Sequence, residues 1–156
     1  MNRKIFTIGV ISLLIDQISK SLIDMFIHLE KEITIFKWFK LTNLNNTGCA
    51  FSFLEGKNYL LAVIGIVIIF ILISIIKDYK DCFLTNLAFG LLFGGILGNL
   101  SDRVFLGFVR DFIMVGSFPV FNAADAFICI GVFLILVETF LERNKDGSRG
   151  KHKRKN

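Results

Sequence analysis

The chain has 156 residues, of which 54% are hydrophobic and 18 are phenylalanine, and its mean hydropathy is +0.65. This composition is too apolar for an ordinary soluble domain and is typical of a small integral membrane protein. The net charge of +5 is concentrated in the last fifteen residues, which favours a topology signal and contact with anionic lipids over nucleic-acid binding.

Four segments are long and apolar enough to cross a hydrocarbon core of roughly 30 Å. The first resembles a secretory signal peptide, but Asp16, Lys20 and Asp24 interrupt it and no small-residue cleavage site follows, so we interpret it as a retained span. The sequence therefore predicts an all-α membrane protein with one domain over 1–141 and a disordered basic tail over 142–156. The predicted spans are 5–27, 59–76, 83–106 and 122–141.

Basic residues predict the orientation of these spans. The N-terminus, the linker at 77–80 and above all the tail, with seven Lys and Arg, are positive, although the loop at 29–58 also holds four Lys beside three Glu. With four spans, the three positive segments share one side, so we expect both termini in the cytoplasm. The two ends of the segment between spans three and four then face outward.

The loop between spans one and two is the largest polar segment. Residues 33–42 are rich in β-branched and aromatic types, which predicts one or two short strands at the membrane surface with Trp38 in the interfacial belt. Residues 45–53 begin with turn formers and become apolar again, so we expect them to dip toward the bilayer. Asn45, Asn46 and Gly48 form either a simple turn or an amide site for extended substrate backbone, and the residues leave both interpretations open.

Span three carries glycines at helical spacing. Gly90, Gly94 and Gly98 recur every fourth residue, which predicts a groove where another helix can approach closely. The same stripe continues to Asp102, and the neighbouring stripe holds Gly95, Asn99 and Arg103. We therefore expect the polar residues Asn99, Asp102 and Arg103 in the interior of the bundle.

Asp16 and Lys20 have the i, i+4 order that favours a helical ion pair. A catalytic Lys20 acting on Ser19 or Ser21 is the weaker alternative, because neighbouring serines on a helix point in other directions. Asp102 and Arg103 are adjacent and should each pair with another span, with Asp16 a candidate partner for Arg103. Direct contact with substrate backbone or a lipid headgroup is the alternative.

Asp111 and Asp125 lie 14 positions apart, on either side of a turn containing Gly116, Ser117 and Pro119. If the flanking runs are membrane helices, the two acids meet at one membrane face, where such residues are costly and usually functional. Two facing carboxylates share a proton and can act as acid and base in hydrolysis.

Asn122 and Asp125 also have the spacing of a helix cap, so Asp125 could serve only to cap span four. Its place near a helix N-terminus should make Asp125 the more readily ionised of the pair, and hence the base.

Several other chemistries are disfavoured. His28 and His152 are the only histidines, which excludes the H-E-x-x-H zinc motif and argues against a Ser-His-Asp triad. Cys49, Cys82 and Cys129 show no C-x-x-C spacing and form no framework of paired disulfides.

Five blocks of the chain resemble lipoprotein signal peptidase, also called signal peptidase II, and occur in that family's order. The resemblance covers all but the tail. The one departure noted is Cys49, where Ala or Gly is more usual. The blocks are DQISK (16–20), NTGCAFS (46–52), GGILGNLSDR (94–103), VRDFI (109–113) and FNAAD (121–125).

The resemblance implies an aspartic endopeptidase of the bacterial inner membrane that needs no metal or cofactor. It would cleave prolipoproteins just before a cysteine carrying diacylglycerol, with Asp111 and Asp125 catalytic, and would carry a small extracytoplasmic β-cradle. We expect prolipoproteins and membrane lipids as partners, no nucleic acid, and a monomer. The positions implied to bind substrate or support the site are Asn46, Gly48, Asn99, Arg103, Asn122, Asp16, Lys20 and Asp102.

Two other functions are compatible with a polar cluster in four spans. A proton- or cation-coupled carrier would use four acids as a relay, namely Asp16, Asp102, Asp111 and Asp125. Such a carrier predicts acids spread through the depth of the membrane, whereas Asp111 and Asp125 are expected at one face. A non-catalytic assembly factor would use the glycine face and leave the acid pair unexplained.

Overall fold

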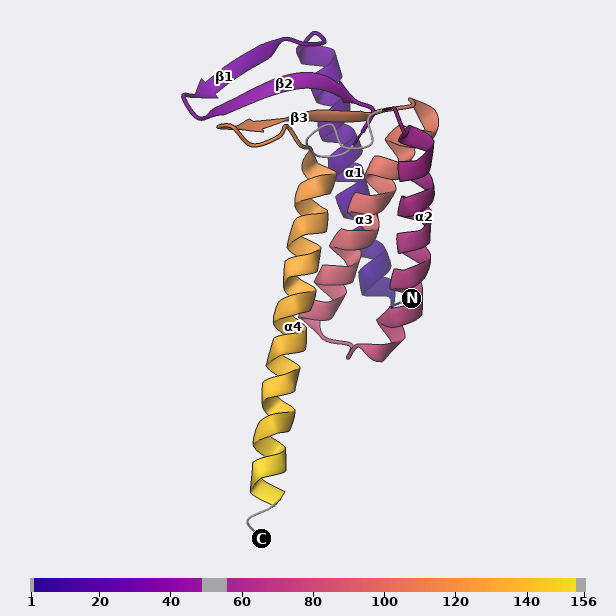
Figure 1. The fold of residues 1–156 in the computed structure, drawn as a ribbon, viewed down its shortest axis with the longest axis vertical. Helices are drawn as coiled ribbons and strands as arrows, with labels where there is room; N and C mark the ends of the chain where they lie inside the picture. Colours follow the sequence, from indigo (N-terminus) through magenta and orange to yellow (C-terminus); the bar gives the residue numbers. More distant parts are fainter. Residues whose placement is uncertain (1, 49–55, 154–156) are drawn as a thin grey trace.

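A computed structural model of the chain describes residues 2–48 and 56–153, so Cys49 lies outside the described residues. Four helices are long and apolar enough to span a membrane, and a three-stranded sheet covers one end of their bundle (Figure 1). The helices are α1 (Arg3–Phe26), α2 (Asn58–Ile75) with the 3₁₀ turn η2 (Ile76–Asp78), α3 (Phe83–Phe105) and α4 (Ala123–Lys153). The strands are β1 (Glu32–Phe36), β2 (Phe39–Asn46) and β3 (Val109–Val115).

The predicted spans agree with the helices to within two residues at every end except one. The backbone of α4 continues as a helix from residue 141 through Lys153, in the basic segment for which we expected disorder. The expected class, an all-α membrane protein with a small β element, is confirmed.

Helix α3 lies at the centre of the bundle and packs against α1, α2 and α4. In its apolar stretch 67% of residues are buried inside the protein, against 28% or less in the other three helices, whose apolar side chains mostly face outward. The core around α3 includes Phe89, Leu92, Phe93 and Ile96. A polar side chain on α3 is therefore shielded from lipid on most sides.

The glycines of α3 bring its backbone against two neighbours. A Cβ at Gly94 would lie 2.6 Å from the carbonyl oxygen of Gly9 on α1, and a Cβ at Gly95 would lie 2.6 Å from that of Ala124 on α4. Since real Cβ atoms do not approach backbone so closely, glycine is required at both positions. The predicted glycine groove is confirmed, and it places the polar ends of α1, α3 and α4 side by side.

The sheet is antiparallel, in the order β1-β2-β3. The β1–β2 hairpin corresponds to the strands predicted within 33–42, whereas β3 was not predicted and comes from the segment between α3 and α4. Strand β2 pairs along β3 with Asn46 opposite Val109 and Leu44 opposite Asp111, and a bulge lies between Leu41 and Leu44. Asp111 is therefore held by a strand, not by a turn or the end of a span.

We expect Gly94→Ala to lower the free energy of unfolding by about 1–3 kcal/mol, because the added methyl group must push α1 and α3 apart. The matched control is Gly65→Ala on α2, where the nearest atom to an added Cβ is Ile96 Cγ2 at 3.8 Å, an ordinary contact. Thermal unfolding of the purified variants in detergent measures both. Equal stability of the two variants would contradict the close approach.

Candidate active site

Asp111 is brought to the site by two chain reversals around β3. Gly107 has a φ of +86° and Gly116 a φ of +55°, backbone conformations that favour glycine, at the two ends of the strand. The second reversal brings Phe121 beside β3, where its carbonyl oxygen accepts hydrogen bonds from the backbone N–H groups of Phe112 and Ile113. This pairing folds the start of α4 back onto β3.

The Asp111 carboxylate is 4% exposed and accepts hydrogen bonds from two amides. Asn46 Nδ2, at the end of β2, donates to Oδ2 over 2.7 Å, and Asn122 Nδ2, just before α4, donates to Oδ1 over 2.7 Å. The Oδ1 of Asn46 accepts from the Gly48 backbone N–H, which fixes the orientation of that amide. Asn46 therefore both forms a turn with Gly48 and binds the Asp111 carboxylate.

Asp125 lies in the first turn of α4 and takes part in a reciprocal cap. Its backbone N–H donates to Asn122 Oδ1 over 3.0 Å, and the Asn122 N–H donates to Asp125 Oδ2 over 3.2 Å. The other carboxylate oxygen, Oδ1, accepts from Asn99 Nδ2 on α3 at 2.8 Å. Capping and membership of the polar cluster are therefore both observed for Asp125.

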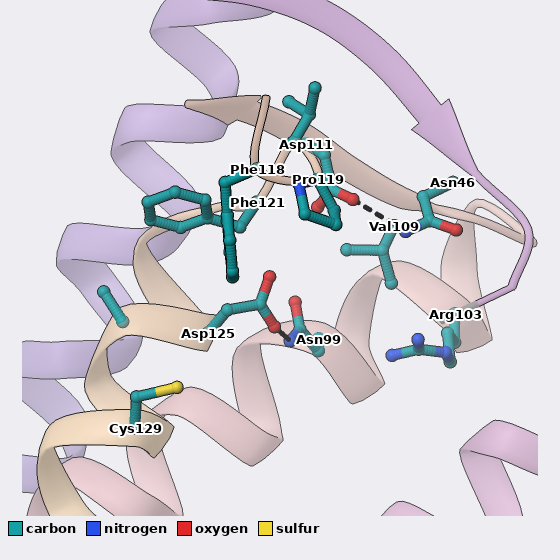
Figure 2. Close-up of a pocket in the computed structure, with 12 residues that line it drawn as sticks. Asn46, Asn99, Arg103, Val109, Asp111, Phe118, Pro119, Phe121, Asp125 and Cys129 are labelled. Atoms are coloured by element: carbon teal, nitrogen blue, oxygen red, sulfur yellow. Dashed lines mark hydrogen bonds between the residues drawn. The ribbon is translucent and has the colours of Figure 1, made fainter. Parts of the chain in front are cut away.

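Both carboxylates line one pocket of about 460 Å³ (Figure 2). Asn46, Asn99 and Arg103 supply its other polar groups. The walls are otherwise mostly apolar, with Val109, Pro119, Phe118, Phe121 and Cys129 among the lining residues.

Burial raises the pKa of Asp111 to about 6. The hydrogen bond from Asn46 opposes this shift, and the negative charge of Asp125 adds to it. Asp111 therefore retains its proton more readily than an ordinary aspartate does.

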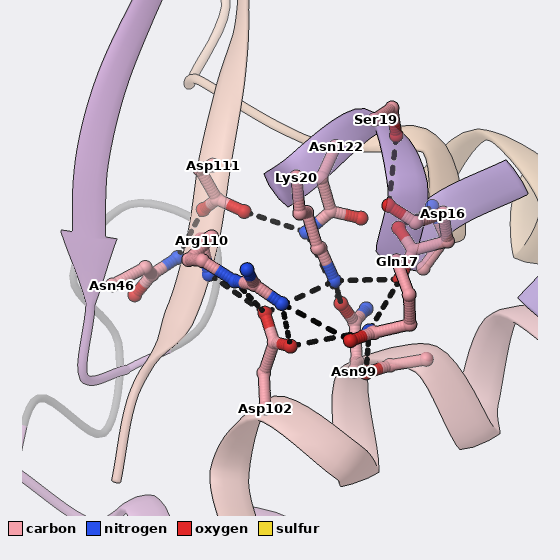
Figure 3. A network of polar contacts seen from close by, with 12 residues as sticks. Asp16, Gln17, Ser19, Lys20, Asn46, Asn99, Asp102, Arg110, Asp111 and Asn122 are labelled. Atoms are coloured by element: carbon pink, nitrogen blue, oxygen red, sulfur yellow. Dashed lines mark hydrogen bonds and ion pairs between the residues drawn. The ribbon is translucent and has the colours of Figure 1, made fainter. Parts of the chain in front are cut away.

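A buried ion network reaches Asn99, one of the residues that line the pocket (Figure 3). Lys20 Nζ lies 2.8 Å from Asp16 Oδ2 and 3.3 Å from Asp102 Oδ2, and all three side chains are at most 1% exposed. Lys20 also donates to Asn99 Oδ1 over 3.1 Å, and the Ala124 backbone N–H donates to Asp16 Oδ1 over 2.9 Å. The network therefore joins α1, α3 and α4, and through Asn99 it is connected to Asp125.

The predicted ion pair of Asp16 and Lys20 is confirmed, and the catalytic alternative for Lys20 finds no support. Ser19 Oγ donates to the Asp16 carbonyl oxygen and Ser21 Oγ to that of Gln17, so both hydroxyls are bonded to the backbone of their own helix. Lys20 is instead surrounded by carboxylates and an amide oxygen.

The suggested pairing of Arg103 with Asp16 is wrong. Asp16 is bound by Lys20, whereas Arg103 faces the pocket, where its Nη2 donates to the Gly48 carbonyl oxygen over 3.2 Å. Adjacent residues on a helix diverge by about 100°, so Asp102 and Arg103 face different neighbours. Asp102 faces the network and Arg103 the cavity.

Sequence reasoning missed two members of the network, Gln17 and Arg110. Gln17 Nε2 donates to both Asp16 Oδ2 and Asp102 Oδ1, and Arg110 pairs with Asp102 over 2.8 Å. The alternation of side chains along VRDFI would have placed Arg110 opposite Asp111, had the segment been interpreted as a strand. Among the described residues, no three His, Cys, Asp or Glu are grouped as metal ligands would be.

We expect Lys20→Met to lower the free energy of unfolding by about 3–5 kcal/mol, since it leaves Asp16 and Asp102 buried with too little positive charge. Lys4→Met, at an exposed position on the same helix, should change it by no more than about 0.5 kcal/mol. Thermal unfolding in detergent measures both. Similar effects of the two substitutions would show that the network does not hold the bundle together.

A family model described as signal peptidase (SPase) II matches residues 8–141. A lipoprotein signal peptidase of Photorhabdus laumondii is 38% identical over 157 residues, which cover 90% of this chain and 94% of that protein. A solved bacterial membrane enzyme superposes with a TM-score of 0.82 at 33% identity, covering 91% of this chain and 90% of the other. A second solved bacterial membrane enzyme superposes with a TM-score of 0.77 at 34% identity, and the match covers 85% of this chain and 90% of the other.

Proposed function

Because the chain belongs to the signal peptidase II family, whose members remove signal peptides from lipoprotein precursors, we propose that this protease uses Asp111 and Asp125 as its catalytic pair. The observation that carries the proposal is the convergence of the two carboxylates, from β3 and α4, in one pocket with different surroundings. A carrier function finds no support in these relationships.

In the proposed reaction Asp111 begins protonated and Asp125 ionised. Asp125 removes a proton from a water molecule, whose oxygen attacks the scissile carbonyl carbon, while Asp111 donates a hydrogen bond to the carbonyl oxygen. The tetrahedral intermediate collapses as its nitrogen takes the proton of Asp111 and the C–N bond breaks. Asp125 keeps the proton from water, so the pair ends with one proton, as it began.

The surroundings of the two acids support this assignment. The raised pKa of Asp111 favours its protonated form, and the first turn of α4 favours a negative charge on Asp125. We propose that Asn46, Asn122 and Asn99 hold the two carboxyl groups in place for the reaction. Their amides reach the carboxylates over 2.7 to 2.8 Å.

Arg103 and Gly48 are proposed to bind the substrate backbone beside the acids. The support is that the Arg103 guanidinium lines the pocket and reaches the Gly48 carbonyl, so a donor lies at the pocket wall. Asp16, Lys20 and Asp102 are proposed to support the site from below without contacting substrate, since they are at most 1% exposed.

We further propose that both ends of the chain face the cytoplasm and that the pocket opens toward the outer side of the bacterial membrane. The sheet lies at one end of the bundle, while the start of α1, the α2–α3 connection and the last turns of α4 lie toward the other (Figure 1). The pocket is lined by residues of β3 and of the first turns of α4, near the sheet. The sequence is rich in basic residues at the N-terminus, in this connection and in the tail, which supports a cytoplasmic location for that second end.

Asp111→Asn and Asp125→Asn should each lower the rate of signal-peptide removal by at least about a hundredfold, because asparagine keeps the shape of the side chain without its proton chemistry. The measurement is cleavage of a lipidated model prolipoprotein by purified enzyme, followed by gel shift. A chelator should leave the wild-type rate unchanged. Normal turnover by either variant would contradict the catalytic pair.

Stability provides the control for Asp111→Asn. The folded-state pKa of about 6 exceeds the ordinary value of 3.8, so the folded protein binds this proton more tightly than the unfolded chain does. The wild-type free energy of unfolding should therefore fall as the pH rises from about 4 to about 6, and Asp111→Asn should remove this part of the slope. An inactive variant that remains folded at pH 7 separates lost chemistry from lost structure.

We propose that the substrate carries diacylglycerol on the cysteine that follows the scissile bond. Two acyl chains anchor a peptide firmly, at about 0.8 kcal/mol per buried methylene, and would hold the bond near the depth of Asp111 and Asp125. A diacylglyceryl precursor should be cut just before that cysteine, and an unlipidated or Cys→Ser precursor should not be cut. Gel shift with and without prior lipidation measures this, and equal cleavage of both forms would overturn it.

A further inference from the structure

Arg110 precedes Asp111 in the chain, and its side chain leaves β3 on the opposite face. Asp111 lines the pocket of about 460 Å³, whereas Arg110 lines a separate cavity of about 390 Å³ beside Asp24 and His28, at the end of α1. The guanidinium extends from β3 toward Asp102 and Gln17 (Figure 3). Arg110 therefore does not line the pocket of the carboxylate pair.

Arg110 ties its strand to two helices through five hydrogen bonds. Its backbone N–H and Nε both donate to Asp102 Oδ2, over 3.1 and 3.2 Å, and Nη2 donates to Asp102 Oδ1 over 2.8 Å. Nη2 also donates to Gln17 Oε1 and Nη1 to Asp24 Oδ2, each over 3.0 Å, both on α1. A forked contact of this kind fixes orientation as well as position, and the side chain is only 12% exposed.

The pairing of β3 with β2 is interrupted beside Asp111. Strand β3 has seven residues, ends near glycines with positive φ, and pairs with β2 across a bulge that lies next to Asp111 in the ladder. A bulge interrupts the hydrogen-bonded ladder and bends the strand. The five bonds of Arg110, one residue away, therefore add to the Phe121 pairing and to the amides that hold Asp111 in place.

The contacts of Arg110 are also connected to Asp125. Asp102, which binds Arg110, also binds Lys20, and Lys20 donates to Asn99 Oδ1. Asn99 in turn donates to Asp125. One connected set of polar contacts thus ends on Asp125 and, through the backbone of β3, on Asp111.

We propose that Arg110 is a positioning residue for the reaction: it fixes β3 on α1 and α3 and so sets the place of Asp111 relative to Asp125. The inference rests on the proposed roles of the two acids. A misplacement of about 1 Å in a reacting group can cost a hundredfold in rate, so a loosened strand should act on turnover.

The test compares Arg110→Met and Arg110→Lys with Lys40→Met, which removes an exposed ion pair with Glu32 in the same sheet. Turnover and KM are measured on the lipidated model precursor, per molecule of folded enzyme. We expect Arg110→Met to lower kcat by about ten- to a hundredfold with KM within about twofold of wild type. Arg110→Lys keeps the charge but loses the forked contact, so its kcat should lie between those of Arg110→Met and wild type. The kcat of Lys40→Met should equal that of wild type.

A purely structural role would lower the melting temperature and leave kcat per folded molecule unchanged, and that result overturns the proposal. A raised KM with normal kcat would also overturn it, because Arg110 would then contribute to substrate binding. If Arg110→Met does not fold, the kcat of Arg110→Lys decides. Asp111→Asn is assayed in parallel: if it is inactive while both Arg110 variants turn over normally, only the positioning role fails, and if it is active the catalytic pair fails as well.

Discussion

A buried charge must be neutralised within the protein, and this requirement organises the end of the bundle that carries the site. Lys20 and Arg110 lie among Asp16 and Asp102, two positive groups against two carboxylates, in a region that lipid and water reach poorly. Removing any one of them would leave a charge whose transfer from water is costly. The four groups come from α1, α3 and β3, so the need for balance fixes the relative positions of these elements.

The close packing of α3 makes that balance geometrically possible. The Gly9 contact at Gly94 and the Ala124 contact at Gly95 bring three helix backbones so near one another that short side chains can bridge them. Asn122 is an example: the one side chain caps α4 and donates hydrogen bonds to both Asp111 and Asn99. A substitution of Asn122 would therefore disturb the surroundings of both carboxylates.

Much of the architecture could be predicted from the sequence, because membrane spans and close glycine contacts leave local patterns. The spans, the glycine groove and the Asp16–Lys20 pair all follow from spacing along single helices. Strand β3 was not predicted because its partner, β2, lies before α2 in the chain, and pairing between segments so far apart leaves no local pattern. The expected pairing of Asp102 with another span is confirmed by Lys20 on α1, whereas its second partner, Arg110, was missed because it lies on that strand. Lys20 also binds Asp16, the partner that was expected for Arg103.

The bond from the Ala124 backbone to Asp16 also bears on how the protein is made. Chains emerge from the N-terminus, so α1 and α3 enter the membrane before α4 exists. Until α4 arrives, Asp16 lacks the donor at Ala124 and Asp111 lacks the Asn122 amide. Helix α4 is synthesised after α1 and α3 and completes the polar contacts of α1, so Asp111 and Asp125 come together only once α4 has been made. A chain without α4 would lack Asp125 and the Ala124 bond to Asp16, so the proposed catalytic pair could not form in it.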